Sequence, residues 1–365
     1  FVGGLGIMTM AAFLLAILGQ KVSTSQKLMI RETMNTSNIG GIQSLSVAIV
    51  ATAITIQLIG FVLLLIRFLF LFPLDEAIWQ ALFHSVSAFN NAGFIAFNST
   101  EGLHQFQSDF VVLSIMTWLI ILGSLSFWVV ADIFTKKQFR LYSLVSKIVI
   151  VTTFSLIVIS STAFFFSERA NVQTIGNLDL SNQIFISIFE SVSGRTAGFS
   201  TIDYTQINNS TNIFQTVMMF IGGATGSVAG GIKVTTLFVI VLSIFALIRE
   251  NPEIHIFKRH IDQSTVIRSY AILVISLVFV IVCAFLLSIT NDGFMFKDIM
   301  FDSVSAYGTV GLSSGVTQQL NSVGKLIIVF TMFLGRIGPL IIGLRMIRTQ
   351  ENLGFRYPNE TVTIG

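Results

Sequence analysis

Charged residues, proline and cysteine are all scarce in this sequence. Asp, Glu, Lys and Arg together make up 11% of its 365 residues, whereas soluble domains carry about 25%. Hydrophobic residues account for 53%, and the mean hydropathy is +0.83. Such a chain cannot cover its surface with polar side chains, so we expect most of that surface to face a lipid bilayer. The net charge of +3 is spread between loops, which argues against nucleic-acid binding.

With one cysteine and four histidines, the sequence offers little material for disulfides, metal sites or catalytic centres. Lone Cys283 lies in an apolar run and cannot form an intrachain disulfide. The four histidines show no metal-ligand spacing inside an apolar run, and no spacing suggests a catalytic triad or a pair of catalytic carboxylates. We therefore expect no enzymatic activity and no organic cofactor.

One short phrase is present three times, at residues 83–94, 189–199 and 301–312. Each copy begins with Phe, then His, Glu or Asp, then Ser-Val-Ser. After a short gap come Ala-Gly-Phe in the first two copies and Val-Gly-Leu in the third. A repeat usually defines the unit of a fold. We therefore expect a unit made of a spanning helix, a short helix, a Gly loop and a second spanning helix.

Apolar runs flank the three copies and are long enough for the roughly 20 residues that cross a bilayer. We expect spanning helices at 46–72, 110–134, 141–166, 266–290 and 323–346, a long apolar stretch at 212–249, and short helices at 75–89, 180–193 and 296–305. Residues 1–19 match the closing helix of an earlier unit whose beginning the sequence lacks. The sequence predicts an all-α membrane protein of repeated units. A truncated first unit with a cytosolic loop occupies 1–40, and the later units occupy 41–140, 141–262 and 263–365, the last with the C-terminal tail.

The charges divide between two sets of loops. Loops without a Gly phrase hold 14 of the 21 Lys and Arg residues, and the Gly-phrase side holds 11 of the 18 Asp and Glu residues. By the positive-inside rule, the Gly loops enter from outside, while the basic loops and the C-terminus lie in the cytosol. An acidic outer face also attracts cations to the mouth of a pore.

A Gly loop that follows a short helix within a membrane can bind a dehydrated cation. Backbone carbonyls replace the hydration oxygens, Gly tolerates the backbone geometry this requires, and the negative end of the short helix points at the ion. Ordinary re-entrant turns that close a bundle are the alternative, but three copies with an acidic mouth favour a shared cavity. The expected ion selectivity filter consists of Asn90, Asn91, Ala92, Gly93, Thr196, Ala197, Gly198, Thr309, Val310 and Gly311.

These loops also resemble those of a known family. The matching residues are Asn91-Ala92-Gly93-Phe94, Thr196-Ala197-Gly198-Phe199 and Thr309-Val310-Gly311-Leu312. They are similar to the filters of the Trk/Ktr/HKT potassium-transporter superfamily, and the short ending at 355–358 is most similar to the bacterial Ktr-type membrane subunit. The resemblance implies K⁺ uptake across the bacterial plasma membrane through a pseudo-fourfold pore, with K⁺ at the three filter glycines. It also implies a homodimer bound to a cytosolic ring of nucleotide-binding, RCK-type regulatory subunits.

The preference for K⁺ or Na⁺ stays open at this stage. In this family, Na⁺-preferring members often carry Ser in place of Gly in the first filter, and that filter is absent from the sequence. Na⁺ therefore remains a candidate transported ion beside K⁺. The alternative function is a Na⁺-conducting or Na⁺-coupled symporter built from discontinuous helices. It would need a charged coupling site at mid-depth, and no pair of Asp or Glu residues lies in the middle of an apolar run.

A Gly-rich segment interrupts the apolar stretch at 212–249. Five of the ten residues from Gly222 to Gly231 are Gly, and each costs about 1 kcal/mol of helix stability relative to Ala. A phosphate-binding loop would need Gly-Lys-Ser/Thr, which Gly231-Ile232-Lys233 does not supply. Close helix packing through small residues is a second alternative. We favour an irregular loop that obstructs the pore, and the resemblance implies the family's intramembrane gate. Its expected members are Gly222, Gly223, Ala224, Thr225, Gly226, Ser227, Val228, Ala229, Gly230, Gly231 and, at the lower edge, Lys233.

Arg336 is the only charged residue between Lys325 and Arg345. It follows Lys325 by 11 residues, or about 16 Å along a helix, which is near mid-membrane. A charge at that depth costs about 2.5–3.5 kcal/mol and normally faces a cavity. A side chain that snorkels to the interface is the alternative. We expect Arg336 to face the pore, to raise the barrier to cations and to contact the Gly-rich loop.

Several other polar residues lie near the repeated phrases. Arg67 is expected to anchor a helix end at the membrane interface. Glu190 and Asp302 occupy the place of His84 in the other unit, where they either hold the loop through backbone N–H groups or attract cations. Arg195 is expected to point behind its loop, toward Glu190 or Asp203. His255 and His260 fall in a basic cytosolic loop.

Overall fold

The computed structural model describes residues 1–5, 42–97, 102–250 and 254–348. The closing helix expected at 1–19 is represented by α1 (Val2–Leu5) alone. The loop expected from residue 20 to 41 and the tail from residue 349 onward lie outside the described residues. Side chains of residues 337–348 are outside the description as well.

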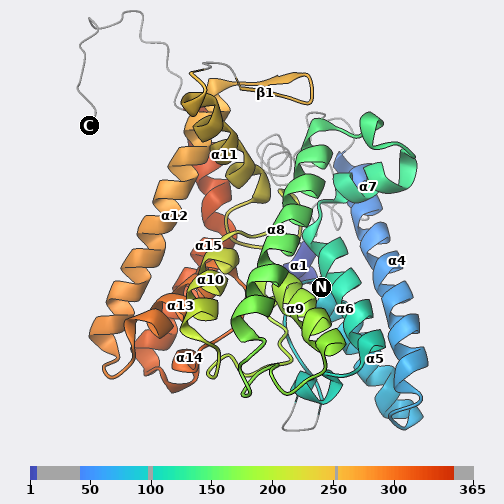
Figure 1. Ribbon diagram of the computed structural model, residues 1–365. Coiled ribbons are helices and arrows are strands. Elements are labelled where there is room, and N and C mark those ends of the chain that lie inside the picture. The colour runs from blue at the N-terminus through green and yellow to red at the C-terminus, as the bar shows by residue number, and fades with distance from the viewer. Residues whose placement is uncertain (6–41, 98–101, 251–253, 349–365) are drawn as a thin grey trace, which may run out of the picture.

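Helices form three groups that repeat the same order (Figure 1). The first group is α4 (Ile42–Phe68), α5 (Leu74–Phe89), α6 (Phe110–Ser124) and α7 (Phe127–Thr135). The second is α8 (Leu144–Glu168), α9 (Leu180–Thr196), α10 (Asn209–Phe220) and α11 (Val234–Ile248). The third is α12 (Gln263–Thr290), α13 (Phe296–Gly308), α14 (Val316–Gln319) and α15 (Ser322–Arg348). Two short 3₁₀ turns, η1 (Gly102–Phe106) and η2 (Phe139–Leu141), complete the helical elements.

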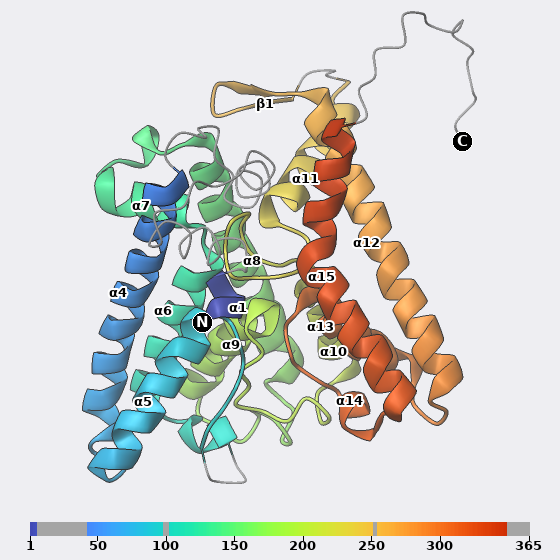
Figure 2. The ribbon, with the colours of Figure 1, turned by 180° about the vertical axis from the view of Figure 1, so that it is seen from behind.

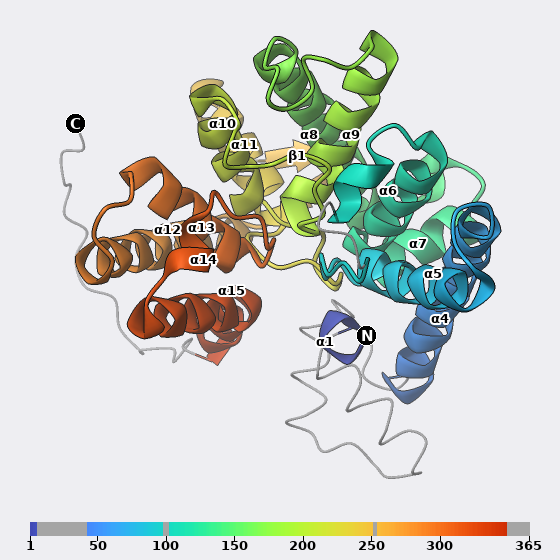
Figure 3. The ribbon, with the colours of Figure 1, turned by 90° about the horizontal axis from the view of Figure 1, so that it is seen from below.

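The three groups surround a common centre (Figure 3). Within each group the short helix, α5, α9 or α13, packs against the long helix before it and ends at its Gly loop. From behind, α12 and α15 run beside each other on one side of the molecule, and α1 lies near the centre (Figure 2). The prediction of repeated helix–loop–helix units is confirmed.

The described part of the chain contains three helices long and apolar enough to cross a membrane by themselves. These are Val47–Phe68 within α4, together with α8 and α12. Their outward faces expose large apolar side chains such as Leu58, Phe154 and Phe285. Because soluble monomers rarely expose contiguous apolar surface of this extent, these faces are suited to lipid.

The expected continuous helix at 110–134 is wrong. It breaks after Ser124, and α6 and α7 meet at an angle of 108°. The side chain of Ser126 accepts a hydrogen bond from the N–H of Val129 and so begins α7 anew. The break frees the last carbonyl groups of α6, and the residues that use them belong to the Gly-rich loop described below.

A second difference is a small β-hairpin, so the fold is not purely α-helical. Strands β1 (Ile254–Ile256) and β2 (Arg259–Ile261) pair antiparallel, with His255 opposite His260. Phe257 and Lys258 form the turn, with φ of 48° and 62°. The hairpin lies at the end of the molecule opposite the connections from α4 to α5 and from α12 to α13 (Figure 1).

An ion pair or a hydrogen bond links the end of each long helix to the start of the helix that follows the Gly loop. Arg67 at the end of α4 pairs with Asp109, which caps α6, at 2.9 Å. Buried Glu168 at the end of α8 accepts a hydrogen bond from the N–H of Asn208, directly before α10, at 2.9 Å. Asn291 after α12 accepts one from the N–H of Asn321, directly before α15, also at 2.9 Å. Arg67 is thus a partner in an ion pair, and its role as an interface anchor stays a prediction.

Candidate ion pathway

The three Gly loops lie against one another, and each holds its glycine in the left-handed backbone region. Gly93, Gly198 and Gly311 have φ of 71°, 78° and 100°, which side chains disfavour and Gly tolerates. A Cβ on Gly93 would lie 2.4 Å from the carbonyl oxygen of Ala197, and one on Gly198 would lie 2.0 Å from that of Val310. Neighbouring loops therefore approach closely through backbone alone. No described atom lies within 4 Å of a Cβ on Gly311.

Side chains in the loops strengthen one of these contacts. Asn91, which has φ of 49°, lies with its amide 3.1 Å from the hydroxyl of Thr196 in the next loop. Asn90 instead turns back on its own helix, where its amide donates to the carbonyl of Val86 at 2.8 Å. Most of the expected filter residues lie in the segments where the loops meet; they are Asn91, Ala92, Gly93, Thr196, Ala197, Gly198, Thr309, Val310 and Gly311. The side chain of Asn90 differs, because it bonds to the end of its own helix.

The second Ser of each phrase fixes the bend of its loop. Ser87 donates to the carbonyl of Phe94 at 2.9 Å, and Ser193 donates to that of Phe199 at 2.6 Å. Ser305 accepts from the N–H of Gly311 at 3.1 Å. All three hydroxyls thus satisfy backbone groups that the bend leaves without helical partners.

The variable second residue of each phrase holds the segment that leaves the loop. Buried Glu190 accepts from the N–H of Thr201 at 2.7 Å, and buried Asp302 accepts from the N–H of Thr317 at 2.7 Å. Buried His84 accepts from the N–H of Ala96 at a longer 3.4 Å, and its ring stacks on Phe97. The sequence left open whether these residues hold the loop or attract cations. Their hydrogen bonds to backbone N–H groups support the role of holding the loop.

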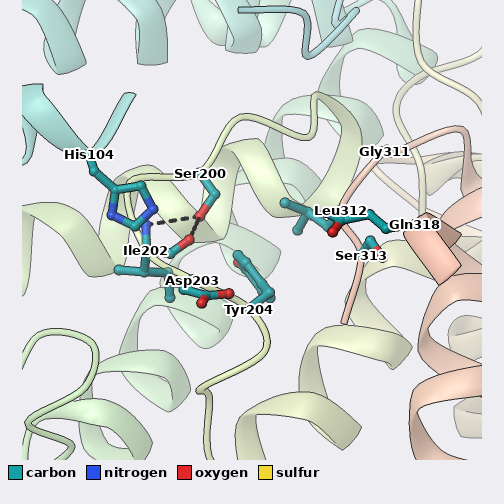
Figure 4. Close-up of a pocket in the computed structure, with 9 residues that line it drawn as sticks. All are labelled: His104, Ser200, Ile202, Asp203, Tyr204, Gly311, Leu312, Ser313 and Gln318. Atoms are coloured by element: carbon teal, nitrogen blue, oxygen red, sulfur yellow. Dashed lines mark hydrogen bonds between the residues drawn. The ribbon is translucent and has the colours of Figure 1, made fainter. Parts of the chain in front are cut away.

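An open cavity of about 660 Å³ lies outside the second and third of these loops (Figure 4). Its lining combines one carboxylate with hydroxyl, amide, imidazole and apolar groups. The lining residues are His104, Ser200, Ile202, Asp203, Tyr204, Gly311, Leu312, Ser313 and Gln318. Because Gly311 forms part of its wall, the cavity leaves the third Gly loop open to solvent from that end.

The Gly-rich segment is an irregular loop between α10 and α11, as predicted. Its two ends close on each other, because the N–H of Gly222 donates to the carbonyl of Ile232 at 2.8 Å. The N–H of Ala224 then donates to the carbonyl of Ser124 at 3.0 Å, and that of Val228 donates to Gly123 at 3.3 Å. The carbonyl groups freed by the break after α6 therefore bind this loop.

Two basic side chains also hold the loop. Lys233 donates to the carbonyl of Ala229 at 2.6 Å. Arg336 of α15 donates through Nη1 to the carbonyl of Val228, and through Nη2 to Gly3 and Gly4 of α1 at 2.8 and 3.1 Å. The expected contact between Arg336 and the broken helix is therefore present. The carbonyl acceptors at Gly123 and Ser124 were not predicted from the sequence, where the only signal was a Gly-Ser-Leu-Ser run inside an apolar segment.

The expected ion pair of Arg195 is absent. In the described part of the chain, the ion pairs are those of Arg67 with Asp109 and of Lys136 with Asp132. Glu190 binds Ser200, Thr201 and Tyr204 instead. Arg195 is nevertheless buried beside its loop, with 2% of its surface exposed.

The fold and these loops define a multi-pass membrane protein in which re-entrant backbone loops meet at a common centre. Comparison with known proteins agrees with this class. The family model for the cation transport protein TrkH matches residues 1–148 and 143–353. The chain belongs to this family of cation transport proteins.

Three relatives and one solved structure illustrate the similarity. Ktr system potassium uptake protein B of Bacillus subtilis is 36% identical over all of this chain and 81% of its own length. The protein of that name from Vibrio alginolyticus is 35% identical, over all of this chain and 80% of its own length. Potassium/sodium uptake protein NtpJ of Enterococcus hirae is 32% identical, again over the whole chain and 81% of its own length. The crystal structure of the potassium transporter TrkH from Vibrio parahaemolyticus matches 95% of this chain and 70% of its own with a TM-score of 0.70 at 16% identity, which is a likeness of fold.

Proposed function

We propose that this protein takes up K⁺ across the bacterial plasma membrane through a filter of backbone carbonyls contributed by its repeated Gly loops. The observation that carries the proposal is the meeting of three loops through backbone, with left-handed glycines at corresponding positions. Rings of carbonyls replace the hydration shell of an ion without placing charged side chains in its path. Relatives named as potassium uptake proteins over the full chain support K⁺ as the ion.

The primary test is rescue of a bacterial strain that lacks K⁺ uptake. Expression of the wild-type chain is expected to restore growth at low external K⁺, and the purified protein in liposomes is expected to pass K⁺ down its gradient. Variants Gly93→Ser and Gly198→Ser provide the matched comparison, since each adds a side chain where a neighbouring carbonyl oxygen stands. Absence of K⁺ flux through correctly inserted wild-type protein would refute the proposal.

Transport of Na⁺ is the second candidate function. It is favoured by the similarity to a relative named as a potassium/sodium uptake protein. The liposome assay separates the candidates when K⁺ and Na⁺ gradients are applied singly and then together. Flux of Na⁺ alone, or K⁺ flux that requires Na⁺, would replace K⁺ conduction with Na⁺ conduction or coupled transport.

We further propose that residues Gly222–Gly231, with Lys233 and Arg336, form a gate in the pathway. The loop is held between the end of α6 and the side chain of Arg336, which suits an obstruction that other elements can release. Deletion of Ala224–Gly230 is expected to raise ion flux, and Arg336→Ala is expected to raise basal flux by removing the contact to Val228. Lys325→Ala, an exposed position on the same helix, serves as the control. Unchanged flux in both gate variants would contradict this role.

Assembly and placement in the membrane belong to the same proposal. We infer units at 41–140, 141–262 and 263–365, a homodimer, and a cytosolic ring of nucleotide-binding RCK-type subunits as regulators. The Gly loops would open to the outside, and the basic loops and C-terminus would face the cytosol. Mass measurement of the protein in lipid nanodiscs tests the dimer, and co-purification with a regulatory subunit of the same cell tests the ring.

A further inference from the structure

Arg195 carries a positive charge that no acidic residue of the described chain pairs with. The residue is 2% exposed, and its Nε and Nη1 atoms are buried without a hydrogen-bond partner. Arginine stays protonated in proteins, so this charge persists inside the molecule. Glu190, the nearest carboxylate along the chain, uses its oxygens for Ser200, Thr201 and Tyr204.

The charge lies next to the candidate filter. Arg195 is followed directly by Thr196, whose hydroxyl contacts Asn91 of the neighbouring loop. Its backbone is within about 10 Å of that of Gly198, because three residues span at most about 3.5 Å each. At the corresponding places the other two loops carry the uncharged residues Asn90 and Gly308.

Arg195 also occupies the last turn of α9. The end of a helix carries about half a negative charge, which would attract a cation in the adjoining loop. A full positive charge in the same turn more than cancels that attraction. Among the three pore helices, α9 alone has a basic residue in its last turn.

A second buried polar side chain without a hydrogen-bond partner lies behind this loop. Gln215 of α10 is fully buried, and both polar atoms of its amide lack a hydrogen-bond partner. Its Nε2 lies 2.2 Å from the position that a Cβ on Gly194 would occupy. An amide cannot neutralise the guanidinium, so Gln215 leaves this positive charge in place.

We propose that the charge of Arg195 weakens the binding of K⁺ in the filter and thereby speeds the exit of the ion. Conduction needs sites that bind well enough for the ion to arrive and weakly enough for it to leave. Arg195 supplies the second condition from behind the filter, outside the ion path. The inference rests on the proposed function of K⁺ conduction.

The test compares Arg195→Gln with Arg195→Lys in liposomes, with apparent K⁺ affinity and maximal flux measured separately. Arg195→Gln is expected to lower the half-saturating K⁺ concentration by roughly 15-fold, the size expected for a unit charge about 10 Å away at an effective dielectric constant of about 20. Its maximal flux is expected to fall. Arg195→Lys keeps the charge and is expected to keep the wild-type affinity.

A second variant guards against a failure of Arg195→Gln to fold. Gln215→Glu adds a negative charge behind the same loop while Arg195 stays in place. Like Arg195→Gln, it makes the net charge there less positive, and it is also expected to tighten K⁺ binding. K⁺ titrations of each purified variant in detergent, beside its melting temperature, separate binding from stability.

Three results would overturn the inference. They are an unchanged K⁺ affinity in a stable Arg195→Gln protein, equal shifts in Arg195→Gln and Arg195→Lys, and a wild-type affinity that changes when chloride is replaced by gluconate. The last would mean that a bound anion already neutralises the guanidinium. Lack of K⁺ flux in the wild type would instead count against the proposed function itself.

Discussion

At the scale of single residues, the three glycines of the proposed filter are not equivalent. All three have positive φ, so alanine costs roughly 1–2 kcal/mol of backbone strain at each. At Gly198 a Cβ would also collide with the carbonyl oxygen of Val310, whereas at Gly311 no described atom is near. A substitution at Gly198 must therefore move a carbonyl of the neighbouring loop.

We predict that Gly198→Ala impairs K⁺ selectivity more than Gly311→Ala does. The displaced carbonyl of Val310 would leave its place in the ring, while Gly311→Ala adds backbone strain alone. The ratio of K⁺ to Na⁺ flux in liposomes measures the difference. Equal loss of selectivity in the two variants would show that strain, and not the contact between loops, governs the filter.

The buried carboxylates of the repeated phrase act as backbone anchors. Glu190→Gln replaces an acceptor-only carboxylate, which binds Thr201 through Oε1 and Tyr204 through Oε2, with an amide whose NH₂ must face one of these two donors. We expect a loss of about 1–3 kcal/mol in stability, the cost of a buried polar group left without a partner. Thermal unfolding in detergent measures it, with exposed Asp292→Asn as the control. A melting temperature equal to that of the control would remove the anchor role.

The anchors also mark what the sequence could and could not supply at the site. The glycines were predictable because a repeated Gly at a helix end signals a local backbone requirement. The partners of Glu190 and Arg195 were not, since they depend on how the chain returns after the loop. Arg195, expected to point toward Glu190 or Asp203, forms an ion pair with neither in the described residues. The carboxylate of Glu190 instead accepts hydrogen bonds from the backbone and hydroxyl donors of residues 200–204.

At the scale of elements, apolar length predicted the spanning helices well. The helix expected at 266–290 is found as Gln263–Thr290, and that at 323–346 as Ser322–Arg348. Bilayer thickness sets such lengths locally. The break between α6 and α7 was missed because it serves a distant partner: Gly123 and Ser124 receive the N–H groups of Val228 and Ala224. A two-stranded hairpin of three-residue strands likewise gives too short a pattern to detect.

The hydrogen bond between the end of α12 and the start of α15 yields a third prediction. Asn291→Ala removes the acceptor for the N–H of Asn321 at the start of α15. It also opens space beside Gly324, whose Cβ position lies 2.5 Å from Asn291 Nδ2. We expect a loss of about 0.5–1.5 kcal/mol for the lost hydrogen bond, measured by thermal unfolding. Ser288→Ala, near the same helix end and bonded only to the carbonyl of Phe285, is the comparison, and an equal effect there would point to fraying of α12 instead.

At the scale of the whole molecule, the Gly-rich loop is the element through which the groups of helices meet. Its ends belong to α10 and α11, its N–H groups bind the end of α6, and its Val228 carbonyl binds Arg336 on α15. A shift of one group relative to the others must therefore change the hydrogen bonds of this loop. The fold thus provides a mechanical route from a movement of these helices to the Gly-rich loop.

The orientation of the molecule in the membrane is the last prediction. Lys258 in the hairpin precedes α12, and Asp292 follows it. The 28 residues of α12 span about 42 Å, which is enough to cross a bilayer, so the two positions lie on opposite sides. The positive-inside rule places the basic hairpin in the cytosol.

Cysteine labelling can test this orientation directly, because the chain has a single cysteine, Cys283, and it is buried. In a Cys283→Ala background, Asp292→Cys is expected to react with a membrane-impermeant maleimide on intact cells, and Lys258→Cys is expected to react in inside-out vesicles alone. The parent without cysteine is the blank. Reaction of both positions from one side would contradict a spanning α12, and exchanged sides would invert the proposed direction of the filter. With the sides as predicted, the open cavity outside Gly311 faces the medium from which the ion is taken up.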